Sequence, residues 1–169
     1  MGNAPLVVVM GISGVGKSAV GHEVADRLDV PYADGDDYHP PANIEKMSAG
    51  TPLDDDDRWP WLRAVGQWLA DRSDTGGVIS CSALKRAYRD VLRDAAPDVL
   101  FLHLVGDHDL IADRMSHREH FMPVSLLESQ ERTLEPLADD ERGWVYDITP
   151  PPDEIARHFL ADAGLENPA

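Results

Sequence analysis

Residues 11–18 read Gly-Ile-Ser-Gly-Val-Gly-Lys-Ser and match the pattern G-x-x-x-x-G-K-[ST] at every fixed position. An apolar run at 6–10 precedes this stretch and a helical pattern begins at Lys17, so a strand, a glycine-rich turn and a helix follow one another. Such a turn directs backbone N–H groups and the positive end of a helix dipole at one spot, where a polyphosphate binds. Lys17 would reach the β- and γ-phosphates, and the Ser18 hydroxyl would ligate Mg²⁺. The stretch therefore predicts a nucleoside triphosphate site but leaves the phosphate acceptor open.

Two carboxylates follow the next apolar segment, at Asp34 and Asp36 on either side of a glycine. In a phosphotransferase, one carboxylate here can hold Mg²⁺ and the other can accept the hydrogen bond of a substrate hydroxyl, which aids in-line attack on the γ-phosphate. An Asx-rich turn is the alternative, because Asp-Gly forms such turns readily. The phosphate-binding loop lies one strand–helix unit upstream, so we expect a catalytic role.

The chain carries 15 basic and 31 acidic residues, for a net charge of −16. This balance argues against a general nucleic-acid binder, which needs a basic face. A site for an anionic nucleotide must gather basic residues against this acidic background, so basic residues near loops are informative. Arg58 follows the acidic cluster 54–57 and predicts either an anion partner or a pairing with that cluster. Lys85 and Arg89 would share a helix face and form a second anion site, or else a solvated surface.

A polar segment at about 116–125 carries Arg118 and His120 between two helical patterns, and it is typical of a lid. Closing a lid would exclude water and bring a cation onto the transferring phosphate. No Cys or acidic ligand pattern accompanies His117 and His120, so they do not predict a metal site. Cys81 has no histidine or acid at a recognisable spacing, so we interpret it as a buried strand residue.

Strand-like and helix-like segments alternate along the whole chain, which predicts a parallel sheet. The expected strands are 6–10, 30–33, 78–81, 99–105 and 144–148, and the expected helices are 17–28, 43–48, 58–69, 82–93, 109–115, 126–134 and 153–163. This is an α/β fold with three layers, a five-stranded parallel sheet, helices on both faces and a short lid, in a single domain at 1–169. Every motif above falls at a strand's carboxyl end, which predicts one shared active site.

No run of 18 apolar residues occurs, and the first residues lack a basic and apolar signal pattern. A single cysteine cannot form an internal disulfide. We therefore expect a cytoplasmic protein that binds no membrane.

Several stretches together resemble the gluconokinases, small P-loop sugar-acid kinases related to shikimate kinase. Besides residues 11–18 they are D-G-D-D-Y-H-P at 34–40, N-I-E-K-M at 43–47, G-T-P-L-D-D-D-D-R at 50–58, W-L at 61–62, C-S-A-L-K at 81–85 with Y-R-D at 88–90, H-F-M-P at 120–123, Gln130 and T-L-E at 133–135. They span nearly the whole chain. The stretches D-G-D-D-Y-H-P at 34–40 and C-S-A-L-K at 81–85 are far more specific than the phosphate loop.

The resemblance implies a P-loop NTPase fold and ATP-dependent phosphorylation of D-gluconate at its 6-hydroxyl, with Mg²⁺ as cofactor and a homodimer as the assembly. It implies Lys17, Asp36 and Arg118 as catalytic residues, and Ser18 and Asp34 as metal ligands. The nucleotide-binding set is Gly11, Ser13, Gly14, Val15, Gly16, Lys17, Ser18, Ala19, Arg114 and Arg118. The substrate-binding set is Asp34, Asp36, His39, Arg58, Lys85, Arg89 and His120, mostly in a helical region at about 38–73.

Two other functions remain open at this level. One is another small-molecule kinase of the same fold, with a shikimate-like or nucleotide acceptor. The second is a nucleotide-binding regulatory module that transfers no phosphate, although the polar residues on the acceptor side would then have no purpose.

Overall fold

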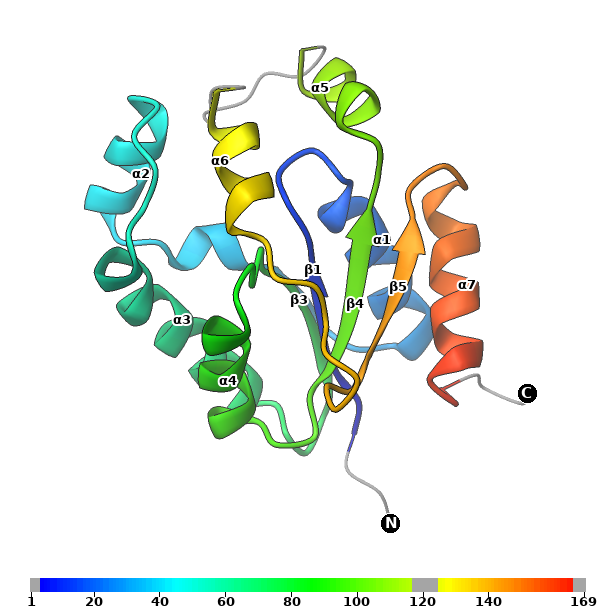
Figure 1. Ribbon diagram of the computed structural model, residues 1–169. Coiled ribbons are helices and arrows are strands. Elements are labelled where there is room, and N and C mark those ends of the chain that lie inside the picture. The colour runs from blue at the N-terminus through cyan, green and yellow to red at the C-terminus, as the bar shows by residue number, and fades with distance from the viewer. Residues whose placement is uncertain (1–3, 117–124, 166–169) are drawn as a thin grey trace.

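The computed structural model describes residues 4–116 and 125–165, and a five-stranded sheet forms its centre (Figure 1). The strands are β1 (Leu6–Met10), β2 (Tyr32–Asp34), β3 (Gly77–Ser80), β4 (Leu100–Val105) and β5 (Gly143–Asp147). Their spatial order is β2-β3-β1-β4-β5, and every neighbouring pair is parallel. The predicted five-stranded parallel α/β fold is confirmed.

Helices cover both faces of this sheet and complete the three layers. They are α1 (Lys17–Leu28), α2 (Pro41–Ser48), α3 (Asp55–Ala70), α4 (Arg86–Ala95), α5 (His108–Ser116), α6 (Ser125–Thr133) and α7 (Pro152–Asp162), with a short 3₁₀ helix η1 (Gly35–Tyr38). Helix α1 packs against α7, and α3 packs against α4 on the opposite side of the sheet (Figure 1). None of the described helices is long and apolar enough to cross a bilayer.

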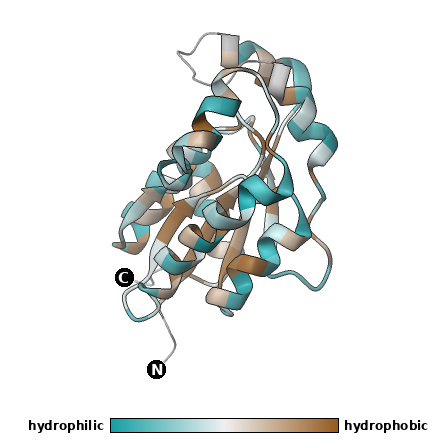
Figure 2. Ribbon diagram, turned by 90° about the vertical axis from the view of Figure 1, so that its left-hand side faces the viewer, coloured by the Kyte–Doolittle hydropathy of each residue, from teal (hydrophilic) through white to brown (hydrophobic). Residues whose placement is uncertain are grey.

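The apolar core lies between the sheet and these helices. All five residues of β1 are buried, as are the four residues of β3, so the central strands are covered on both faces. Continuous apolar strands of this kind are expected in a parallel sheet that helices flank. Figure 2 shows hydrophobic strands inside a shell of largely hydrophilic helices.

Several element boundaries differ from the sequence expectation, and local hydrogen bonds explain two of them. Strand β2 begins after Val30, because Asp29 adopts a left-handed conformation (φ 56°) and the Val30 N–H donates to the α1 carbonyl of Ala25 at 3.0 Å. Helix α3 begins at Asp55 rather than at 58. Asp54 caps it, since its carboxylate accepts from the Asp57 N–H at 2.8 Å while the Asp57 carboxylate accepts from the Asp54 N–H at 3.0 Å. The acidic cluster is thus the cap and first turn of α3.

His103 is a buried histidine in the middle of β4, in register with Met10 of β1 and Val145 of β5. Neither ring nitrogen has a hydrogen-bond partner within residues 4–116 and 125–165. Burial lowers the pKa of His103 to about 4, and the charges of Arg89 and Lys17 act in the same direction. The unfolded chain therefore binds a proton at this histidine between about pH 6.5 and pH 4 while the folded chain does not, so acidification through this window lowers stability.

We expect His103→Leu to raise the free energy of unfolding at pH 7 by about 1 to 3 kcal/mol, because it removes two unpaired buried nitrogens. The variant should also lose less stability than the wild type between pH 7 and pH 5. Urea unfolding at the two pH values measures both effects. His158→Gln, at an exposed position of α7, is the control and should leave the pH dependence unchanged. An unaltered pH dependence in His103→Leu would contradict this assignment.

Candidate active site

The loop between β1 and α1 leads through a left-handed glycine into the N-terminus of α1. Gly16 caps α1 with φ 90°, a left-handed value that favours glycine. No side chain caps the helix and its first turn holds no acidic residue, so its N-terminal N–H groups face the loop without a local competing carboxylate. The Lys17 ammonium donates to the carbonyls of Gly11 and Ile12, both at 2.9 Å. Burial lowers the pKa of Lys17, and the nearby carboxylate of Asp36 opposes this shift.

The two carboxylates after β2 have different roles in the local structure. Asp34 forms the Asx turn, because its Oδ1 accepts from the Asp36 N–H at 2.9 Å and from the Ser80 hydroxyl at 3.3 Å. Asp36 instead directs its carboxylate into a pocket, where 49% of its side-chain surface stays exposed. Partial desolvation raises the pKa of Asp36, whereas the Lys17 ammonium lowers it. Asp34 thus forms the turn that the sequence allows, and Asp36 lies in the pocket.

Two contacts fix the turn that carries Asp36. A Cβ on Gly35 would lie 2.1 Å from the Ser80 carbonyl oxygen, so only glycine allows this close approach to β3. The Trp61 indole N–H donates to the Gly35 carbonyl at 2.8 Å. Trp61 is buried and stacks on the ring of His39, with centroids 4.0 Å apart and planes inclined by 16°. Helix α3 therefore sets the position of η1.

Two cationic side chains, Arg58 and Lys85, lie close together near the first turn of α3. Arg58 donates to the Tyr88 hydroxyl at 2.8 Å, and that hydroxyl donates to Asp55 at 2.5 Å. Lys85 donates to the same Asp55 oxygen at 3.2 Å. Arg58 is therefore linked to the acidic first turn of α3 through Tyr88, and its guanidinium also lines the pocket. Arg58 and Lys85 converge on one side, where an anionic group of a ligand would be attracted.

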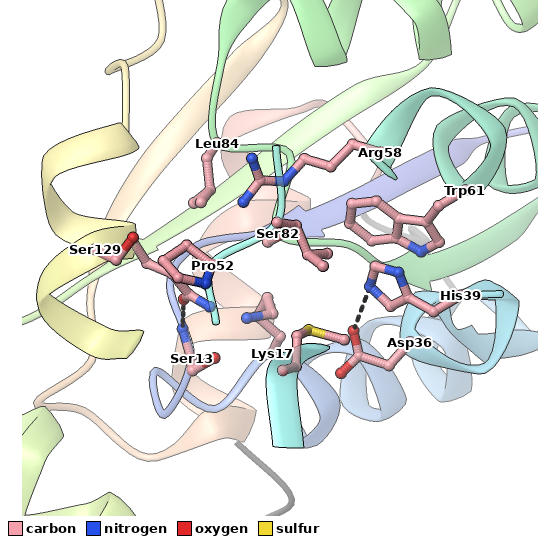
Figure 3. Close-up of a pocket in the computed structure, with 13 residues that line it drawn as sticks. Ser13, Lys17, Asp36, His39, Pro52, Arg58, Trp61, Ser82, Leu84 and Ser129 are labelled. Atoms are coloured by element: carbon pink, nitrogen blue, oxygen red, sulfur yellow. Dashed lines mark hydrogen bonds and ion pairs between the residues drawn. The ribbon is translucent and has the colours of Figure 1, made fainter. Parts of the chain in front are cut away.

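One pocket joins these groups. Figure 3 shows the side chains of Lys17, Asp36 and Arg58 directed into the same space. The Ser13 N–H of the loop donates to the side-chain oxygen of Gln130, on α6, at 2.7 Å. The lining residues are Ser13, Lys17, Asp36, His39, Met47, Pro52, Leu53, Arg58, Trp61, Ser82, Leu84, Ser129 and Gln130.

A separate groove lies next to the glycine-rich loop at 11–18. It is lined by Val15, Gly16, Val20, Arg114, Ile148, Thr149, Pro150, Pro151, Pro152 and Ile155. The Arg114 guanidinium donates to the Ile148 carbonyl at 3.3 Å. The groove combines apolar walls with a planar cation, which is the chemistry that suits a flat aromatic ring. Residues of the loop at 11–18 thus line both the pocket and this groove.

Comparison with known proteins agrees with this arrangement. The shikimate kinase family model matches residues 13–151. The chain is 46% identical over 170 residues to a gluconokinase of Gluconobacter oxydans strain 621H, with 96% of each chain covered. It is 47% identical over 150 residues to the thermoresistant gluconokinase of Escherichia coli K12, with 86% of each chain covered. The crystal structure of a gluconokinase from Sinorhizobium meliloti 1021 superposes with a TM-score of 0.87 at 49% identity, over 97% of this chain and 94% of that one. The chain belongs to the gluconokinase family.

Within this member of the gluconokinase family, the structure brings together most of the predicted site residues that it describes. Lys17, Asp36, His39 and Arg58 share the main pocket, and Lys85 contacts Asp55 at the side where Arg58 lies. Val15, Gly16 and Arg114 line the second groove, and Ser18 and Ala19 are exposed in the first turn of α1. Arg118, His120 and most of the predicted lid lie outside the described residues.

Arg89 does not enter the pocket, contrary to the sequence expectation. Its side chain is fully buried and donates to Glu141 at 2.6 and 3.1 Å and to the Ala83 carbonyl at 2.9 Å. Burial works against the charge of Glu141, but the hydrogen bond and the charge of Arg89, together with the Ala138 N–H and the charge of Arg93, lower the pKa of Glu141. Lys85 and Arg89 do not share a helix face, because Lys85 is the extended N-cap of α4 (φ −104°). Arg89 instead holds the loop before α4 in place.

Four residues of the site were not singled out as site residues from the sequence. Ser82 and Gln130 line the pocket, Trp61 stacks on His39, and Tyr88 links Arg58 to Asp55. Trp61 and Tyr88 lie on the apolar stripes of their helices, so their spacing in the sequence indicates core residues rather than site residues. Gln130 follows the predicted lid by several residues, and its contact with the Ser13 N–H depends on how α6 packs. Ser82 is a polar residue directly after the expected strand 78–81, and this position indicates a site residue from the sequence alone.

Proposed function

We propose that the protein transfers the γ-phosphoryl group of ATP to the 6-hydroxyl of D-gluconate, which gives 6-phospho-D-gluconate and ADP. The observation that carries this proposal is a single pocket lined by Lys17, Asp36 and Arg58, in a chain of the gluconokinase family. The phosphate-binding loop supplies the donor side. The wall around Arg58 supplies a cation for the carboxylate of a sugar acid.

The acceptor is bound at its two ends. Arg58 and Lys85 attract the gluconate carboxylate, while Asp36 accepts a hydrogen bond from the 6-hydroxyl near Lys17. The 6-oxygen attacks the γ-phosphorus, and the bond from that phosphorus to the β–γ bridging oxygen breaks, so ADP leaves with the electron pair. The hydroxyl proton passes to the Asp36 carboxylate and then to solvent. The ammonium of Lys17 stabilises charge on the transferring group.

The donor nucleotide would use the loop and the second groove. The loop residues Gly11, Ser13, Gly14, Val15, Gly16, Lys17, Ser18 and Ala19 surround the phosphates, and Arg114 packs against the adenine in the groove that Pro150–152 help to line. Arg118 would add a second cation at the γ-phosphate, and His120 would contact the acceptor. Closing the segment around them would exclude water, which otherwise competes as the phosphate acceptor.

Ser18 and Asp34 fit a Mg²⁺ ion that accompanies the nucleotide. Both supply oxygen donors at the edge of the sheet, where β2 ends and α1 begins, and Mg²⁺ prefers one or two such groups together with phosphates and water. When bound, the ion neutralises charge on the β- and γ-phosphates. In the structure, Asp34 Oδ1 also accepts the turn-forming bond from the Asp36 N–H.

We further infer that the protein is a cytoplasmic homodimer. The chain has one cysteine, Cys81, which is buried, and burial raises the pKa of its thiol to about 12. A thiol that stays protonated and forms no internal disulfide suits a reducing compartment. Sedimentation equilibrium checks the assembly, where twice the mass of the chain supports the dimer.

Arg58→Ala tests the acceptor side of the proposal. We expect the KM for D-gluconate to rise about 10- to 100-fold, because hydrogen bonds to charged groups contribute about 1.5 to 3 kcal/mol. The KM for ATP should stay within about twofold of the wild type. Steady-state ADP release measured over a range of each substrate separates the two constants.

Arg63→Ala is the matched control for this variant, since it removes the same charge from an exposed position of α3. We expect its kinetics to match those of the wild type. A change in Arg58→Ala that is confined to the KM for ATP would move Arg58 to the nucleotide side and contradict the proposed orientation of gluconate.

A further inference from the structure

His39 connects the pocket carboxylate to the helices of the acceptor side. Its ring is buried, with 8% of the residue exposed, and stacks on Trp61 (Figure 3). One ring nitrogen, Nδ1, lies 3.1 Å from the amide nitrogen of Asn43, and the other, Nε2, faces the carboxylate of Asp36. The two nitrogens therefore contact different partners, and the chemistry of each partner decides where the ring proton resides.

The contacts of Asn43 assign that proton. The Asn43 amide group lies 2.8 Å from the Asp57 carbonyl, which can only accept, so the atom there must be the nitrogen Nδ2. The same Nδ2 faces His39, and as a donor it requires a lone pair on Nδ1. Burial lowers the pKa of His39 to about 4, with the charge of Arg58 adding to the effect, so the ring is neutral at pH 7. The proton of the neutral ring is consequently on Nε2.

This tautomer places an N–H group next to Asp36. His39 Nε2 is 3.7 Å from Asp36 Oδ1, a polar contact somewhat longer than a hydrogen bond. The Asp36 side chain is half exposed, so packing does not lock it at this distance. The opposite tautomer would place a nitrogen lone pair against the carboxylate, which repels it. The direction of the Asn43 contact thus determines whether His39 attracts or repels Asp36.

We propose that His39 is a positioning residue whose Nε2–H, fixed by Asn43, orients the Asp36 carboxylate toward the phosphate acceptor. The connection runs from the Asp57 carbonyl in α3 through Asn43 in α2 to His39 and Asp36. It rests on the proposed function, because it presupposes that Asp36 receives the hydrogen bond of the acceptor hydroxyl. His39 also lines the pocket, so direct contact with the substrate is the alternative that the kinetics below test.

Kinetics of two His39 variants separate positioning from substrate binding. His39→Phe keeps a ring for stacking on Trp61 but has no N–H, and we expect kcat to fall about 10- to 100-fold with the KM for gluconate changed less than threefold. His39→Gln retains an N–H donor near the Nε2 position and should recover most of the loss. His22→Phe, another histidine that contacts an aromatic ring, is the control and should keep wild-type kinetics. A large rise in KM with kcat unchanged in His39→Phe would overturn the positioning role.

Nitrogen NMR of the protein reads the tautomer itself, without substrate. In ¹⁵N-histidine-labelled wild type at pH 7, we expect a protonated Nε2 and an unprotonated Nδ1 for the ring whose signals disappear in His39→Gln. In Asn43→Asp, a carboxylate that can only accept faces Nδ1, so a proton should appear on Nδ1. A protonated Nδ1 in the wild type would overturn the inference even if gluconate is phosphorylated. Absence of gluconate turnover in the wild type would instead defeat the proposed function, and the tautomer would still be measured.

Discussion

Lys17→Ala is expected to reduce kcat for gluconate phosphorylation by about 100-fold or more. The ammonium donates hydrogen bonds to the carbonyls of Gly11 and Ile12, within the glycine-rich loop at 11–18. In the proposed reaction it stabilises the negative charge that develops on the γ-phosphoryl group. Loss of one such preorganised donor from a desolvated site typically costs two to three orders of magnitude in rate. Rapid-quench measurement of ADP formation at saturating substrates gives the rate of the chemical step.

The control for this variant is Arg157→Ala, which removes one positive charge from an exposed position of α7. It tests whether the reduced rate reflects the position of the charge rather than the more negative net charge of the chain. Circular dichroism melting of Lys17→Ala shows whether the loop still folds without its two hydrogen bonds. A folded Lys17→Ala protein with more than about a tenth of the wild-type kcat would contradict the role given to Lys17.

Asp36→Asn is expected to lower kcat by about 10²- to 10⁴-fold while the KM for ATP remains near the wild-type value. The amide preserves the size of the side chain but is a poor acceptor for the hydroxyl proton. The carboxylate lies in the acceptor pocket and not in the groove lined by Arg114, so nucleotide binding should change little. Initial rates over a grid of ATP and gluconate concentrations give kcat, the KM for ATP and the KM for gluconate.

Asp37→Asn is the matched control, since Asp37 is the next residue of η1 and is exposed. Its kcat should stay within about twofold of the wild type. Equal losses of kcat in Asp36→Asn and Asp37→Asn would show that the effect comes from the electrostatic field of the turn, and near-normal turnover in Asp36→Asn would remove this residue from the mechanism.

The elements that local sequence determines were predicted closely. Strand β1 and helix α1 have the predicted bounds, because a five-residue apolar run, a glycine-rich turn and a helical stripe follow one another without competing signals. The meeting of the motifs at one edge of the sheet also followed from sequence, since parallel strands end on the same side. Lys17, which follows β1, and Asp36, which follows β2, share a pocket for this reason.

Side-chain contacts that depend on where a helix begins, or on a partner far away in the sequence, could not be predicted in this way. The face that Arg89 presents depends on whether α4 begins before or after Lys85, and the partner that buries it, Glu141, lies 52 residues away. The contact of Gln130 with the Ser13 N–H spans 117 residues. Tyr88 joins Arg58 and Asp55 across two helices. Such contacts require the packing of whole elements, which periodicity alone does not specify.

The most direct test of the central claim is an acceptor panel with the purified wild-type protein, ATP and Mg²⁺. The panel contains D-gluconate, D-glucitol (the same hydroxyl pattern with the carboxylate replaced by CH₂OH), shikimate and nucleoside monophosphates, with ADP release and ³¹P NMR of the product as readouts. We predict acceptor-dependent ADP release with D-gluconate and a phosphomonoester on its C6 oxygen. D-glucitol should be at least about tenfold poorer, because it lacks the charge that Arg58 and Lys85 attract. Turnover with shikimate or a nucleotide but none with D-gluconate, or a product phosphorylated at another carbon, would contradict the account.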